Sequence, residues 1–179
     1  MSDKKFYIQK ATRSADGTWA LKDKKSLEDD FGYCRYVSLS NANSRGKQKG
    51  LYSETYAESD AASVWFEGSA SREQISISLS VAFFGSDPQV SDNEEDITTL
   101  IQTATNSWQS FCDWLEGGLV IWYDDYRQRY LLMYLQEAVS PESDVIKNMP
   151  YINCKLTFTS VFGRSFDSDT EIKDYLNIK

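Results

Sequence analysis

Histidine is absent from the 179 residues of this sequence. The neutral imidazole ring is the commonest general base in enzymes and the commonest side-chain ligand of transition metals. Its absence excludes serine triads, cysteine–histidine dyads and ordinary zinc sites. The sequence implies no convergent pair of carboxylates that could replace it. We therefore expect a protein that is not an enzyme and that holds no cofactor or metal.

Long apolar runs and an excess of positive charge are also missing. No stretch approaches the roughly 18 consecutive apolar residues of a membrane helix, and the opening MSDKKFYIQK lacks the apolar centre of a signal peptide. Lysine and arginine number 19 against 27 aspartates and glutamates, a net charge of −8. Because such a surface repels phosphate, we expect neither a membrane partner nor specific nucleic-acid binding, and we expect assembly in the cytoplasm.

Cysteine is scarce. Cys34, Cys112 and Cys154 are odd in number, far apart and placed in segments with apolar patterning. Buried free thiols are therefore expected rather than a disulfide.

The chain has enough apolar material for one core. Its hydrophobic share of 41% and aromatic share of 14% suit a single domain over residues 1–179. Alternating apolar and polar residues predict the main strands at 74–84 and 151–162. A hairpin is expected over 6–21, turning at Ala15-Asp16-Gly17, and a further strand over 33–39.

The region after the central strand predicts a helix at about 95–116. Apolar residues recur there at helical spacing: Ile97, Leu100, Ile101, Ala104, Trp108, Phe111, Cys112 and Leu115. Two pairs have capping-box spacing, Ser91 with Glu94 and Asp92 with Glu95. The glycine pair that begins at Gly117 is a natural stop. An aromatic hairpin is expected over 119–136, a loop over 140–150, and a short helix or docking strand in the tail at 164–179.

Residues 40–62 predict a long extended arm. The loop SNANSRGKQKG is polar and basic, and alternating tyrosines and carboxylates follow it. The residues expected to contact other subunits are Arg45, Lys47, Lys49, Tyr52, Glu54, Tyr56 and Glu58. RGKQKG lacks the GxxxxGK[ST] pattern of a phosphate-binding loop, so a solvated loop is the main alternative. Basic and acidic ends on one arm would suit head-to-tail contacts between copies.

These elements together predict a mainly β (α+β) fold. We expect a β-sandwich or half-barrel packed by one amphipathic helix, with its core at about 64–163. One helix cannot cover both faces of a sheet. The outward serine and threonine rows would then need partners from other subunits.

The element order over about 64–163 resembles the N-terminal domain of distal tail proteins of long-tailed bacteriophages and, more broadly, the tail-tube fold. The segments that carry the resemblance are ISISLSVAFF, WQSFCDWLEGG, LVIWYDDYRQRYLLMYL and INCKLTFTSVFG. Distal tail proteins usually continue into a second domain for which this chain has no room, which favours a tube-like subunit or a minimal tail component. The first 60 residues have no counterpart in the resemblance.

The resemblance implies a structural virion component of a phage tail. Such proteins form stacked hexameric rings, with sheets joined around a lumen, an arm reaching the adjacent ring and contacts to other tail proteins. DNA would leave through the lumen without specific binding, and an acidic chain suits a carboxylate-lined wall.

Three other uses of conspicuous residues were weighed. Asp92, Glu94, Glu95 and Asp96 lack the calcium-loop pattern and suit a helix start. Asp124 and Asp125 predict a turn rather than an acid–base pair. An aromatic platform for stacking on sugars would comprise Trp65, Trp122, Tyr123, Tyr126 and Tyr130. The alternative function is therefore a monomeric carbohydrate-binding β-sandwich.

Overall fold

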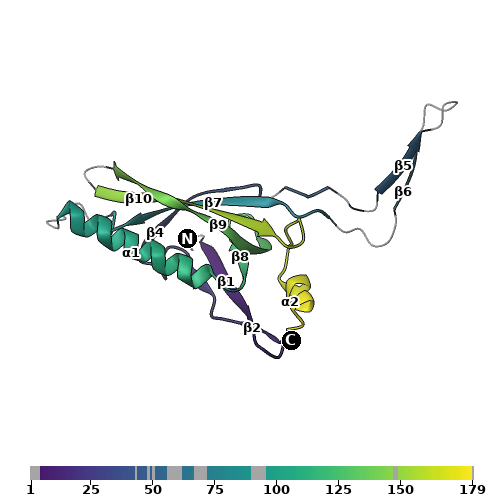
Figure 1. Cartoon of the computed structure of the whole chain (residues 1–179), viewed down its shortest axis with the longest axis horizontal. Coiled ribbons are helices and arrows are strands. Elements are labelled where there is room, and N and C mark those ends of the chain that lie inside the picture. The colour runs from purple at the N-terminus through teal and green to yellow at the C-terminus, as the bar shows by residue number, and fades with distance from the viewer. Residues whose placement is uncertain are drawn as a thin grey trace.

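The computed structural model describes residues 5–42, 44–47, 49, 51–55, 62–66, 72–89, 96–146 and 149–178. For residues 51–55, 62–66, 140 and 144–146 it describes the backbone alone. The elements are β1 (Phe6–Arg13), β2 (Trp19–Leu21), β3 (Lys25–Ser26), β4 (Tyr33–Ser40), β5 (Leu51–Thr55), β6 (Ala62–Phe66), β7 (Ser76–Phe84), α1 (Ile97–Leu115), β8 (Leu119–Asp124), β9 (Arg129–Ile146), β10 (Met149–Ser160) and α2 (Thr170–Leu176). The predicted mainly β fold is confirmed (Figure 1).

One antiparallel sheet dominates the molecule, in the strand order β2-β1-β8-β9-β10-β7-β4, with β3 also paired to β1. The expected hairpins over 6–21 and 119–136 are both present. Gly17 has a φ of 89°, which glycine adopts without strain and which closes the first turn. The two alternating strands lie side by side, because β10 pairs with β7 from Tyr151↔Phe84 to Thr159↔Ser76.

The sheet is rolled. Four strands separate β1 from β4 in the sheet order, yet the ring of Phe6 stacks on that of Tyr36 with centroids 3.9 Å apart. Phe6 also lies 5.4 Å from Trp122 of β8. Of the two expected architectures, the described strands of the main body therefore form the half-barrel, a single curved sheet whose concave side holds the core.

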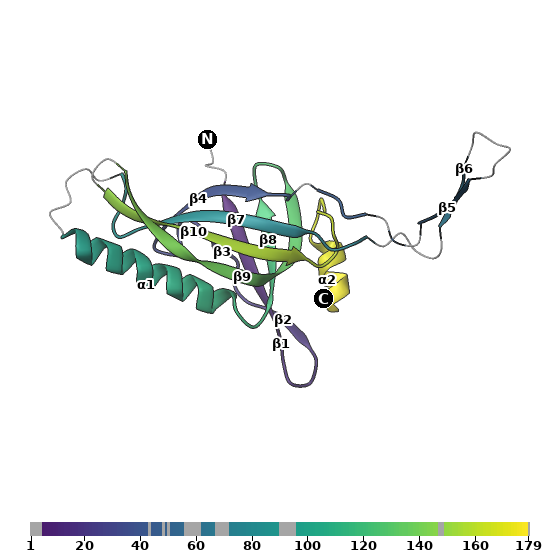
Figure 2. The same ribbon diagram turned by 45° about the horizontal axis from the view of Figure 1, so that its top comes forward.

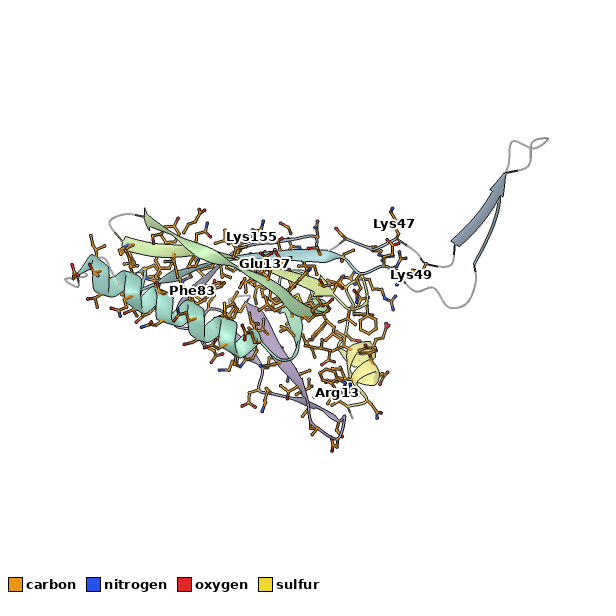
Figure 3. The ribbon with its side chains drawn as sticks, viewed as in Figure 1. Arg13, Lys47, Lys49, Phe83, Glu137 and Lys155 are labelled. Atoms are coloured by element: carbon orange, nitrogen blue, oxygen red, sulfur yellow. The ribbon has the colours of Figure 1, made fainter. Side chains whose placement is uncertain are left out.

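Helix α1 lies along the rolled sheet and contributes five buried side chains, all from the predicted stripe: Leu100, Ala104, Trp108, Phe111 and Leu115. Phe83 of β7, labelled in Figure 3, is fully buried and lies 6.0 Å from Trp108 and 5.7 Å from Phe111. The helix ends before Gly117, whose φ is 73°. Asp96 is the N-cap residue and makes no side-chain capping bond, and the predicted capping pairs lie outside the described residues.

The opposite face of the sheet is covered at one end by the C-terminal tail. Phe166 forms a β-bridge with Tyr130, and α2 then buries Ile172 and Leu176 against β1, β8 and β9. The tail therefore supplies both alternatives left open by the sequence, a docked bridge and a short helix. Figure 2 shows α2 at the end of the body nearer the β5–β6 hairpin.

Two expectations are corrected. Residues 140–150 are not a loop, because β9 continues to Ile146 and pairs with β10 from Met149 onward. Pro141, which has no N–H to donate, falls at a register shift where the ladder is already interrupted. The core also extends beyond 64–163, since Phe6 and Ile8 of β1 are buried in it, whereas residues 64–66 pair with β5 in the separate hairpin.

The three cysteines are free, as expected, and Cys34 and Cys154 are buried. Burial raises the pKa of the Cys154 thiol from 9.0 to about 12. The thiol of Cys154 is therefore neutral in the folded chain at a pH where it would ionise in the unfolded one.

This difference predicts a loss of stability in alkali. Above pH 9 the unfolded chain gives up a proton that the folded chain keeps, so the free energy of unfolding falls as pH rises toward about 12. The expected contribution is about 1.4 kcal/mol per pH unit for this thiol. Urea unfolding of the wild type and of Cys154→Ala between pH 8 and about pH 11 measures it. Parallel stability curves for the two proteins would contradict the assignment.

Candidate functional site

The most distinctive external feature is the β5–β6 hairpin, which stands clear of the main sheet in both views (Figures 1 and 2). Its two strands pair antiparallel from Leu51↔Phe66 to Thr55↔Ala62. Strand β5 lies within the predicted arm of residues 40–62, but the hairpin extends to Phe66 of β6, beyond the predicted end. In the backbone register, Tyr52 is paired with Trp65 and Glu54 with Ser63. Tyr56 and Glu58 lie outside the described residues.

The arm leaves the sheet between β4 and β7, which are neighbours. The amide of Asn41, just after β4, donates its Nδ2 hydrogen to the carbonyl of Ser76 at 3.1 Å. Farther out, the backbone N–H of Glu73 donates to the carbonyl of Lys47 at 2.8 Å. The outgoing and returning segments are therefore bonded to each other before the chain enters the hairpin.

A third segment, residues 160–163 after β10, connects the outgoing and returning segments to the main body through hydrogen bonds. Ser160 donates its N–H to the carbonyl of Ile75 at 2.9 Å, and Gly46 donates its N–H to the carbonyl of Gly163 at 2.9 Å. Arg72 closes the set, because its Nη1 donates to the carbonyl of Gly46 at 3.1 Å. We call this arrangement of residues 44–47, 72–75 and 160–163 the arm junction.

Two glycines, Gly46 and Gly163, allow the three segments of the arm junction to approach each other closely. A Cβ added to either Gly46 or Gly163 would overlap the carbonyl oxygen of Glu73. Gly163 also has a φ of 62°, in the left-handed region. The side chain of any other residue at Gly46 would therefore push the outgoing and returning segments apart.

The arm junction displays positive charge. Arg45, Lys47 and Lys49 are all exposed, and in the described part of the chain none of the three forms an ion pair. Figure 3 shows Lys47 and Lys49 where the arm leaves the body. Three cations with no ion pair among the described residues, in a protein of net charge −8, make this region locally positive.

The sequence interpretation missed part of this site. The sheet brings Arg72, Gly163 and the carbonyl of Glu73 close to the three cations, because β4 and β10 end where β7 begins. Arg45, Lys47 and Lys49 could be identified because basic residues alternate in a glycine-containing loop. No local pattern links Gly163 to Gly46, which lie more than 100 positions apart in the sequence.

The outer face of the sheet, away from α1, carries hydroxyl groups as the alternation predicts. Ser78 and Ser80 of β7 lie beside Thr157 and Lys155 of β10 in the register. Figure 3 shows Lys155 and Glu137 on this face. Glu142, opposite Asn153 in the register, adds a second carboxylate to this face. We call it the hydroxyl face.

The predicted aromatic platform is not assembled. Trp122 is fully buried in the core, whereas Tyr123 and Tyr130 stack at 4.4 Å on the opposite side of the sheet under the ammonium group of Lys24. Tyr126 is exposed beside Phe6. The side chain of Trp65 lies outside the described residues.

The two aspartates of the β8–β9 turn have structural roles. Buried Asp124 accepts hydrogen bonds from the N–H groups of Tyr126 and Arg127, at 2.9 and 3.1 Å. Its other oxygen accepts from the guanidinium of Arg127 at 2.6 Å, and this bond raises the pKa of Arg127. Asp125 accepts from the hydroxyl of Tyr123 at 3.1 Å. Asp124 and Asp125 therefore stabilise a turn, as the sequence predicted.

Within the described ranges, no group of three or more metal-binding side chains is present. No helix described is long and apolar enough to cross a membrane. Comparisons with known proteins add no relative: no known family profile matches the chain, and no curated protein matches it significantly.

The close packing at the arm junction predicts that Gly46→Ala loosens the arm. The added methyl group would displace the carbonyl of Glu73 and break the bonds that join the two segments. Limited proteolysis should then cut within residues 40–75 at least about tenfold faster than in the wild type, as expected for an opening that is about 1.4 kcal/mol easier. Gly117→Ala is the control for destabilisation away from the arm, because its φ of 73° strains alanine there although no atom lies within 4 Å of the added methyl group, so cleavage within residues 40–75 should stay near the wild-type rate. Equal cleavage rates in the two variants would contradict this account.

Proposed function

We propose that this chain is a structural subunit of a phage-type tail, either tail tube or another ring component such as the distal tail protein. Copies would form hexameric rings, and the arm of each copy would contact the next ring. The observation that carries this proposal is the arm itself, an extended hairpin held rigidly at its base and presented away from the body. A projecting hairpin can reach a neighbouring copy and so suits a head-to-tail contact.

The free margins of the sheet support the proposal. Strand β4 is the last strand on one side and is eight residues long, so among the described strands one row of its backbone groups has no ladder partner. An edge of this length pairs readily with another chain. Its register shift near Val37, between Tyr36 and Ser38, would help to fix which part of the edge is used.

The charge distribution supports the arm contact. Arg45, Lys47 and Lys49 lie at the base of the arm, while Glu54 is on β5 and Glu58 and Asp60 follow it in the sequence. A cationic base and an acidic arm on identical copies attract each other in a head-to-tail order and repel in the reverse order. The arrangement therefore favours one polarity of stacking.

The hydroxyl face is suited to a conduit. We propose that it faces the lumen. Its serine and threonine hydroxyls are uncharged, so DNA phosphates would meet cations there only at scattered lysines. The expected carboxylate lining of the lumen stays a prediction, to which Glu137 and Glu142 of this face would contribute. In this role the protein would be a virion component, assembled in the host cytoplasm with other tail proteins, without catalytic activity or cofactor.

Charge reversal at the arm base tests the proposal. The triple variant Arg45→Glu, Lys47→Glu and Lys49→Glu should remain folded but should no longer stack into tubes, because it replaces three attractions by three repulsions. Negative-stain electron microscopy and analytical ultracentrifugation would measure the assemblies, and circular dichroism the fold. The matched control reverses Arg13, Lys22 and Lys24, which lie in and after the β1–β2 hairpin, away from the arm.

Assembly of the wild type should also weaken as salt rises above about 0.15 M, where screening acts within about 8 Å. Normal tubes from the arm variant would refute the stacking contact. A compact wild-type monomer of 20.5 kDa over the whole accessible concentration range would refute the ring proposal and favour the carbohydrate-binding alternative.

A further inference from the structure

A polar cavity of about 520 Å³ opens on the surface where β4 begins, beside the β8–β9 turn. Its lining includes Lys5, Tyr33, Arg35, Asp87, Gln89 and Tyr126. This volume is within the range of sites that bind small molecules. The arm of the proposed tail function involves other residues, whereas Tyr33 and Arg35 of the cavity belong to the start of β4.

An aromatic cleft of about 410 Å³ adjoins it, lined by Phe6, Tyr36, Tyr126 and Arg127. Tyr126 lines both spaces and is 56% exposed. Its ring lies 5.3 Å from that of Phe6, which in turn stacks on Tyr36. The ring of Tyr126 is therefore supported by the closure of the rolled sheet while much of its surface faces solvent.

The charged groups of the polar cavity are held in place by local bonds. Arg35 donates from Nη1 to the carbonyl of Cys34 at 2.9 Å, and its Nη2 lies 3.9 Å from Oδ1 of Asp87. The same oxygen of Asp87 accepts the N–H of Gln89 at 3.0 Å. A guanidinium, a carboxylate and an amide side chain thus lie together, and each is planar.

This combination fits the chemistry of a sugar. Each hydroxyl of a vicinal diol can donate one hydrogen bond and accept another, so it needs donors and acceptors side by side, which Arg35 and Asp87 provide. The apolar C–H face of a sugar ring packs on an aromatic ring such as Tyr126. Three carboxylates line the polar cavity, Glu28, Asp29 and Asp87, against two cations. That balance disfavours anionic ligands.

We propose that these two joined spaces form a binding site for a neutral saccharide chain, with Tyr126 stacking on one sugar unit and Arg35 and Asp87 binding the hydroxyls of its neighbour. The site shares only Tyr126 with the aromatic platform considered from the sequence. Because Tyr33, Arg35 and Tyr36 belong to β4, whose edge is proposed to pair with another copy, binding is measured on unassembled subunits as well as on assemblies.

The test is a titration of the wild-type protein, by calorimetry and by NMR, with neutral oligosaccharides of glucose, galactose, mannose and N-acetylglucosamine. At least one series should bind saturably, with a Kd at or below about 1 mM. Tyr126→Ala should weaken binding by about tenfold or more, because it removes the stacking surface. Asp87→Asn should weaken it too while leaving the shape of the cavity.

Tyr175→Ala is the matched control, since Tyr175 is also 56% exposed but lies on α2. Its affinity should equal that of the wild type. The proposal is overturned if no series binds, if Tyr126→Ala and Tyr175→Ala behave alike, or if Tyr126→Ala changes only the state of assembly. That last outcome would identify the surface as a contact between copies. Loss of tubes in the arm variant with saccharide binding intact would separate the two proposals.

Discussion

The burial of one face of a single long antiparallel sheet controls the rest of this structure. Strands β7 and β10 present alternating apolar side chains to the same side of the sheet. A flat sheet would leave many of these side chains exposed to solvent. Rolling brings Phe6 of β1 onto Tyr36 of β4, and α1 fills the space that remains, with Trp108 and Phe111 against Phe83. Fully burying a large apolar side chain contributes about 1.5–3 kcal/mol, so the many buried side chains drive the curvature.

The curvature in turn produces both sites. Where β4 and β10 end beside the start of β7, three chain segments meet and fix the base of the arm through backbone hydrogen bonds. Where β1 approaches β4, the aromatic side chains that close the roll also support the exposed ring of Tyr126. The interaction surfaces are therefore by-products of how the core is closed, and the charged loops are placed on a scaffold that does not need them for stability.

An acidic chain with a cationic arm base has a simple electrostatic consequence. The average surface repels other copies at long range, whereas the region of Arg45, Lys47 and Lys49 attracts the acidic parts of a neighbour at short range. In the proposed assembly, this distribution of charge would restrict association to one geometry.

Local pattern in the sequence was sufficient for the elements whose periodicity is set by a single core: the strands over 74–84 and 151–162, the stripe of α1 and its stop at Gly117. It also identified the arm and its basic residues, because alternating lysines between glycines suit neither a helix nor a buried strand. Only the tertiary structure decided the continuation of β9 through 140–146, where pairing with β10 overrides a polar, proline-containing sequence. The meeting of Gly46 with Gly163 and of Phe6 with Tyr36 was likewise decided by the roll of the sheet, since contacts between distant residues depend on which strand ends coincide and leave no trace in local spacing.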